Sequence, residues 1–443
     1  MRLKWLRSAL VLVCVVSVAT ACSGGGGASG SPYGAATEAS STVTLPSSTP
    51  AATPAPLPPA LQRALDNVAI VRGLSAPPSL RVELVARSAL PALLDKLLTD
   101  KDRQWFARTT TLYRLLGHLR KDQDYLTVYN SFGSDSVLGL YSPPDDALWV
   151  VYEDGKEVDF DHLPKSEAET LAHEFVHALQ DFHFHLDETY DRVIDDLDRN
   201  LAWTSVIEGD AVTHEALYSQ RFLMRVGAGR ALLLGGIRSV ADVPASITRE
   251  LFFPYTTGAD WVKGIVKNEG TQPIDKMLVD PPAGTAVILH PELRTNGWKP
   301  QVVVLPDLSG ALGAGWKRES GGTFGEFQLR NYLQLRIRAG EAATAASGWQ
   351  GDHYDVYVNG SQSVAAFRIA FKDAADAAEF VDAQDKLLRA AKGDPTPDGV
   401  LTTGKTSDGN VTIRAVVRGN EVVFVIGSSE EAAKRAIRTL LGG

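Results

Sequence analysis

Two histidines four residues apart, with a glutamate beside the first, are the residues of this sequence best suited to chemistry. They are His173, Glu174 and His177, in the pattern H-E-x-x-H. On a helix, positions i and i+4 share a face, so both imidazoles can bind one metal ion. Glu174 would then accept a proton from a metal-bound water, which is the chemistry of metal-assisted hydrolysis. The sequence therefore predicts a metal centre, with one Zn²⁺ per chain as the expected cofactor.

The segment around this motif has the pattern of a helix that packs against a core. Pro164 precedes it, Ser166 is a candidate N-cap, and Glu169 completes a capping box three residues later. An apolar side is supplied by Leu171, Phe175, Val176 and Leu179. We expect the motif to lie on a buried, amphipathic helix.

A catalytic zinc ion takes three protein ligands and leaves one position for water. His183 has the spacing of the third ligand in H-E-x-x-H-x-x-G-x-x-H, but Gln180 stands where that pattern needs a glycine for a sharp turn. Glu208 follows apolar residues in a predicted helix over about 198–226, where a carboxylate without a partner would be costly. The sequence therefore favours Glu208 as the third ligand. Weaker candidates on the same segment are Asp210 with His214, and Glu215.

The motif and the segment after it resemble the gluzincin branch of zinc metallopeptidases, particularly zincin-like bacterial lipoproteins and secreted proteins. The resemblance rests on H-E-x-x-H-A-L-Q from His173 and on E-G-D-A from Glu208, and it extends more softly over residues 60–355. It implies a zinc ion bound by His173, His177 and Glu208, with Glu174 as the general base.

The resemblance also implies a donor that stabilises the oxyanion of the transition state. Enzymes of this type take that donor from a downstream tyrosine or histidine, so Tyr255 is the first candidate and His290 the second. Asp181 or Asp210 is a candidate to orient a ligand histidine.

The remaining patterns predict an α+β protein with two folded domains. Helical periodicity over 60–120 and two strands, Val137–Tyr141 and Ala147–Tyr152, predict a mainly helical zincin-like domain with a small sheet or hairpin over 59–347. The hairpin could offer its edge to an extended peptide. A helix over 324–346 would close this domain. A small α+β C-terminal domain over 348–443 is predicted from strands at 364–371, 411–417 and 422–426 and helices at 373–391 and 428–441.

The N-terminus has the features of an export signal. Arg2, Lys4 and Arg7 precede an apolar run over 10–18, and Ala19-Thr20-Ala21-Cys22 resembles a bacterial lipobox. We expect a signal peptide over 1–21, lipidation of Cys22, and a flexible Gly-, Ser- and Pro-rich linker over 22–58. This predicts a protein anchored by lipid to the bacterial cell membrane and facing its extracytoplasmic side.

Charge and composition narrow the class of partner. The formal net charge of −9 over 443 residues argues against a nucleic-acid partner. The favoured function is a membrane-tethered, zinc-dependent peptidase that acts on peptides or proteins. The alternative is a non-catalytic zincin-fold lipoprotein that binds a metal or a protein partner. Glu174 favours the enzyme, because a binding module has no need of a general base.

Overall fold

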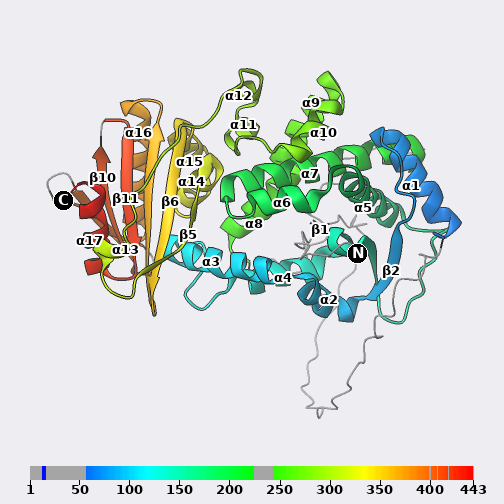
Figure 1. Cartoon of the computed structure of the whole chain (residues 1–443), viewed down its shortest axis with the longest axis horizontal. Helices are drawn as coiled ribbons and strands as arrows, with labels where there is room; N and C mark the ends of the chain where they lie inside the picture. Colours follow the sequence, from blue (N-terminus) through cyan, green and yellow to red (C-terminus); the bar gives the residue numbers. More distant parts are fainter. Residues whose placement is uncertain are drawn as a thin grey trace, which may run out of the picture.

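Two sheets lie toward opposite ends of the molecule, and most of the helices fill the space between them (Figure 1). This computed structural model describes residues 12–15, 56–223, 243–398, 401–406, 408–417 and 419–442. Cys22 and most of the predicted signal peptide and linker lie outside the described residues. The described chain is an α+β protein, as expected, and its C-terminal part is built on an antiparallel sheet.

The smaller sheet has four strands. Its order is β1 (Leu12–Val15), β3 (Val137–Ser142), β4 (Ala147–Tyr152) and β2 (Arg81–Ala86). The β3–β4 hairpin confirms the two predicted strands, while β2 pairs parallel to β4 and β1 pairs antiparallel to β3. Strand β2 was not predicted, and it lies in the gap between the first two helical runs expected within 60–120. Its residues are mostly half-exposed at a sheet edge, so they carry little of the apolar alternation that identifies a strand.

The other elements before this hairpin are helices. They are α1 (Pro59–Arg72), the 3₁₀ turn η1 (Arg87–Ala89), α2 (Leu90–Leu97), α3 (Asp100–Leu116) and α4 (Tyr125–Ser136), and the hairpin itself turns through η2 (Pro143–Asp145). The predicted motif helix follows as α5 (Lys165–Phe184). Its predicted capping box is wrong: Pro164 is the N-cap and Ser166 lies inside the first turn. Glu169 instead accepts a hydrogen bond from Ser219.

A second group of helices continues from α5. It consists of α6 (Leu186–Val193), α7 (Leu197–Tyr218), the π-helical turn η3 (Ser219–Leu223), α8 (Ala245–Phe252), the π-helical turn η4 (Pro254–Gly258), α9 (Ala259–Glu269), α10 (Gln272–Val279), α11 (Ala286–Leu289), α12 (Pro291–Thr295) and α13 (Ser309–Leu312). Helix α7 and η3 correspond to the predicted helix over 198–226, whose last residues lie outside the described part. No described helix is both long enough and apolar enough to span a bilayer.

The larger sheet is entirely antiparallel. Its order is β5 (Lys317–Gly322), β6 (Trp349–Asn359), β7 (Gln362–Phe371), β11 (Glu421–Gly427), β10 (Val411–Val417), β9 (Leu401–Lys405) and β8 (Thr396–Asp398). The predicted strands at 364–371, 411–417 and 422–426 are confirmed. Strand β5 lies before the domain boundary predicted at 348. It was not predicted, because it is a short, glycine-containing segment without apolar alternation.

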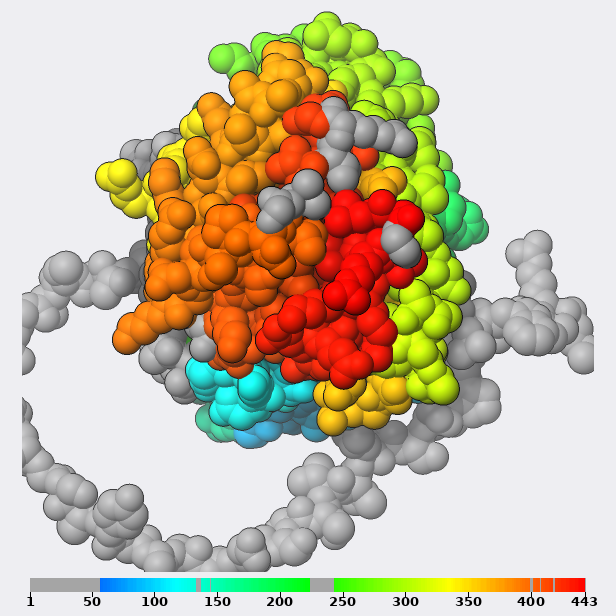
Figure 2. All heavy atoms as spheres, turned by 90° about the vertical axis from the view of Figure 1, so that its left-hand side faces the viewer, coloured from blue at the N-terminus to red at the C-terminus, as the bar shows by residue number. Residues whose placement is uncertain are grey.

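Helices cover both faces of the larger sheet. Phe367 and Phe424 pack with α16 (Ala374–Ala390) on the face toward the rest of the molecule, and Val364 and Val423 pack with α17 (Glu430–Leu440) on the outer face. Figure 2 looks onto this end of the molecule, most of which is formed by the orange and red C-terminal segments. The predicted helix over 324–346 is two helices, α14 (Gly325–Leu333) and α15 (Ala339–Ala346).

Candidate metal centre

Helix α5 carries the H-E-x-x-H motif through the interior of the molecule. Its residues from Thr170 to Asp181 are all buried. Leu171 and Phe175 belong to a cluster that α5 shares with α1 and the small sheet, and α7 packs along another side of α5. The helix is therefore enclosed, and the motif side chains are fixed by packing around them.

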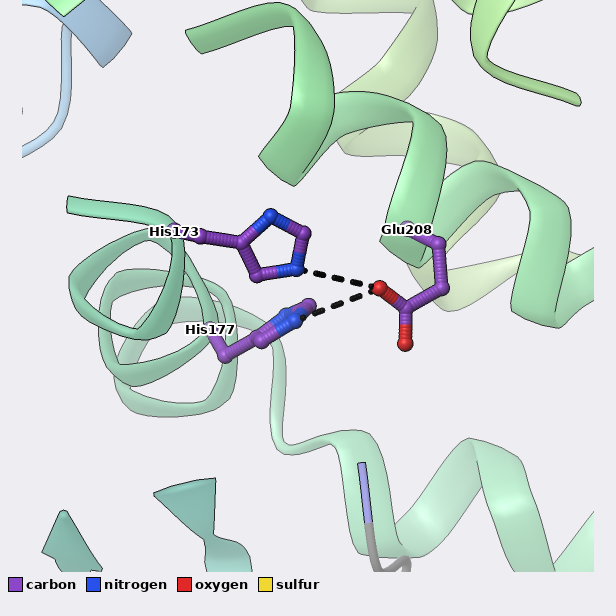
Figure 3. A group of neighbouring side chains, drawn as sticks. All are labelled: His173, His177 and Glu208. Carbon is purple, nitrogen blue, oxygen red and sulfur yellow. Dashed lines mark hydrogen bonds and ion pairs between the residues drawn. The ribbon is translucent and has the colours of Figure 1, made fainter. Parts of the chain in front are cut away.

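Figure 3 shows His173 and His177 of α5 pointing toward Glu208 of α7. Glu208 Oε2 lies 3.2 Å from His173 Nε2 and 3.5 Å from His177 Nε2. The three candidate ligand atoms lie within 4.8 Å of one another, and the three residues are buried. Zinc–nitrogen and zinc–oxygen bonds of ~2.0–2.1 Å in a tetrahedral site place ligand atoms about 3.3 Å apart. The observed separations therefore suit a tetrahedral ion, and these residues fit the predicted metal.

The charge state of Glu208 also suits a ligand. Burial acts to raise its pKa, but the charge of His177 and the hydrogen bond with His173 hold the pKa at about 2. The side chain is therefore a carboxylate at neutral pH, which is the form that binds metals. Burial and the nearby Glu208 raise the pKa of Tyr129 on α4, a residue near the centre that no sequence pattern indicated.

The second ring nitrogen of each histidine has a partner that fixes the ring. His173 Nδ1 lies 3.1 Å from Glu215 Oε2, and His177 Nδ1 lies 2.9 Å from Gln180 Oε1. Such partners set the tautomer and orientation of a ligand histidine, leaving Nε2 for the metal. Glu215, a weaker ligand candidate from the sequence, therefore lies behind His173 rather than among the three converging atoms.

Gln180 links the centre to a buried ionic network. Its Nε2 donates to Asp210 Oδ2 at 2.8 Å and to the Ile207 carbonyl at 3.0 Å. Gln180 thus takes the place predicted for Asp210 beside a ligand histidine, and Asp210 is linked to His177 through it. Asp181, the other candidate for that place, accepts hydrogen bonds from Tyr141 and Leu186.

Asp210 lies between an arginine and a histidine. It lies 2.8 Å from Arg72 Nε of α1 and 2.8 Å from His214 Nδ1, and the side chains of all three are at most 1% exposed. Burial acts to raise the pKa of Asp210, but Arg72 and His214 lower it below its usual range. Asp210 and His214, which the sequence offered as alternative ligands, therefore belong to a network that supports the centre. His183 lies near the end of α5, where its Nε2 is 2.8 Å from the Ser75 carbonyl.

The E-G-D sequence has a structural reason at each position. Glu208 points to the histidines and Asp210 supports Gln180. A Cβ atom at Gly209 would lie 2.7 Å from Val262 Cγ2, and one at Gly258 would lie 2.7 Å from Ser205 Cβ. Only glycine permits so close an approach, so α7 lies directly against η4 and α9.

This close packing brings one of the two predicted oxyanion donors to the centre. The ring of Tyr255, in η4, stacks on His173 with a centroid separation of 6.4 Å and an interplanar angle of 21°. His290, the second candidate, precedes α12, and its Nε2 lies 2.8 Å from Glu326 Oε1. Of the two, Tyr255 is the one in contact with a candidate ligand.

Glu174 lies between the motif helix and the small sheet. It is 0% exposed, and a Cβ atom at Gly139 of β3 would lie 3.4 Å from its Cγ. The candidate general base is thus next to β3, which pairs with β4 on one side and with β1 on the other.

Comparison with known proteins adds one match. A family described as a domain of unknown function, DUF8575, matches residues 314–437, which include the larger sheet from β5 to β11. No curated protein and no solved structure matches the chain.

Proposed function

We propose that this protein is a zinc-dependent metallopeptidase of the gluzincin type, tethered to the extracytoplasmic face of the membrane through a lipid on Cys22. The convergence of His173, His177 and Glu208 beside a buried Glu174 carries this proposal. A structural metal site would need the three ligands, but it would not need a carboxylate at the position of the general base.

The chemistry follows from the placement of the residues. A bound zinc ion would lower the pKa of a water molecule and polarise a peptide carbonyl. Glu174 would accept a proton from the attacking water and pass it to the leaving amine. The Tyr255 ring stacks on His173, so its hydroxyl group is the candidate donor to the oxyanion.

The small sheet supports a peptide as the substrate. Strand β3 runs beside Glu174, and its outer edge accepts β1 as an antiparallel neighbour. Cleavage at the predicted lipobox would remove β1 from the chain and leave that edge open. An extended peptide can pair with such an edge through main-chain hydrogen bonds.

The test is to measure zinc and peptide hydrolysis in the purified mature chain, which begins at Cys22 and lacks β1. We expect about one zinc ion per chain and cleavage of a mixed peptide library. Glu174→Gln should keep the metal and lose hydrolysis by about 10²- to 10⁴-fold. Glu188→Gln, at an exposed position on α6, is the matched control and should retain activity.

Two results would contradict the peptidase. Absence of bound metal in the wild-type chain would remove the centre, and full activity in Glu174→Gln would remove the general base. A wild-type chain that binds zinc but cleaves no peptide would favour the alternative, a metal- or partner-binding lipoprotein of zincin fold.

A further inference from the structure

A cavity of about 220 Å³ lies where α8 and the end of α3 meet α14 and α16. It is formed by residues other than those of the metal centre. Two arginines, Arg249 and Arg336, lie in its wall, and the described lining contains no aspartate or glutamate. The cavity therefore carries positive charge.

The N-terminus of α8 adds to this charge. Pro244, Ala245 and Ser246 line the cavity, and among the described residues no side chain caps this end of the helix. The first N–H groups of a helix and its dipole attract anions. Ser246 is 2% exposed, and its Oγ has no hydrogen-bond partner within the described chain. A buried hydroxyl group in that state is uncommon, and its hydrogen-bonding capacity is available to a bound anion.

His118 supplies a second buried polar group. Gly117, with φ of 87°, ends α3 and turns the chain so that His118 lies in the cavity wall, with its ring 5.0 Å from that of Tyr113. His118 is 2% exposed, and neither ring nitrogen has a partner among the described residues. Burial and the charge of Arg249 lower the pKa of His118 to about 3. The ring is therefore neutral at pH 7 and retains one N–H that can donate.

We propose that this cavity is a binding site for a small oxyanion, namely a phosphate or carboxylate group on a small molecule. Arg249 and Arg336 would bind its charge, and the N-terminus of α8 with Ser246 would donate hydrogen bonds. A cavity of about 220 Å³ is large enough for a phosphate or carboxylate group. The site does not depend on the proposed peptidase function, because none of its residues contacts the metal centre in the described structure.

The test is titration calorimetry of the full chain with inorganic phosphate and, separately, with succinate, in chloride buffer of matched ionic strength. We expect saturable binding of at least one anion to a single site. Ser246→Ala and Arg336→Gln should each weaken it about tenfold, because each removes a hydrogen bond or charge to an anion. Arg338→Gln, an exposed arginine outside the cavity, should bind as the wild type does.

Further variants separate this site from the metal centre. His173→Ala should bind the anion as tightly as the wild type, and loss of binding in that variant would move the anion to the metal and overturn the proposal. It would also be overturned by the absence of saturable binding up to about 10 mM, or by unchanged binding in both Ser246→Ala and Arg336→Gln. Arg336 is exposed, so Arg336→Gln tests the site even if Ser246→Ala fails to fold.

Discussion

Helices α5 and α7 bury ionisable side chains where they meet, whereas the larger sheet buries aromatic rings where it meets α16. In the first region His173, His177 and Glu208 converge, and Asp210 lies close behind them. In the second, the rings of Phe367 and Phe424 stack with centroids 4.4 Å apart and an angle of 7°. The same chain thus builds an apolar core in one place and a charged one in another.

This difference identifies the region built for chemistry. Removing charged groups from water costs several kcal/mol for each ion, and attraction between the ions offsets that cost only in part. Burial of apolar side chains, by contrast, stabilises the fold directly. We infer that the larger sheet supplies stability, and that the charged groups between α5 and α7 are present for the ligand that they bind.

The largest effect is expected from removing one charge of the buried network. Arg72→Leu leaves Asp210 without its main counter-charge, and both side chains are 0% exposed. We expect the free energy of unfolding to fall by about 3–5 kcal/mol in urea titrations. In the sheet region, Arg414→Leu should cost less, because its partner Asp385 has a side chain that is 20% exposed and can be solvated by water. Equal losses would show that the two regions do not differ in this respect.

A smaller effect is expected on metal affinity from Glu208→Ala. Loss of a ligand should weaken zinc binding by more than the factor of about 10–100 that loss of a supporting residue causes. His183→Ala, on the same helix as the two ligand histidines, should leave the affinity near that of the wild type. Competition with a chromophoric chelator measures both. A larger loss of zinc affinity in His183→Ala than in Glu208→Ala would restore His183 as the third ligand.

Gln180 allows a finer comparison between the regions. Gln180→Ala removes the group that orients His177, so zinc affinity should fall by about 10–100-fold. Gln384→Ala removes an equally buried glutamine, which in the sheet region bonds Arg414. It should lower stability without changing zinc affinity. If both variants bound zinc like the wild type, Gln180 would have only a packing role.

The sequence predicted the two helices that carry the centre and the hairpin beside it, but few of the contacts that support the centre. The i, i+4 spacing of His173 and His177 and the apolar residues before Glu208 were sufficient to predict a group that the structure brings together. The role of Gln180 was not foreseen, because its contact with Asp210 joins residues on different helices and has no periodic signal. Strands β5 and β8 were missed for a related reason: short edge strands lack the apolar alternation on which a sequence-based prediction depends. Strands β6 and β9, inside the sheet, were also not predicted.

The smallest predicted effect concerns pH and Asp181, which lies at the far end of α5 from the helix N-terminus. Burial raises its pKa to about 6, although Tyr141 and the Leu186 N–H donate to it. The folded state therefore favours the protonated form. The resulting stabilisation is complete below about pH 4, the ordinary value for aspartate, and is lost as pH rises toward 6.

Asp181→Asn should remove this dependence, because an amide of the same shape does not ionise. We expect the free energy of unfolding of the variant, relative to the wild type, to rise by on the order of 1–2 kcal/mol between pH 4 and pH 7. Urea titrations at several pH values measure the change, with Asp66→Asn at an exposed position of α1 as the control. Parallel pH curves for the wild type and Asp181→Asn would show that Asp181 is ionised in the folded protein throughout this range. In that case Tyr141 and Leu186 would outweigh the burial, and the polar contacts around α5 would contribute to stability as the apolar core of the sheet does.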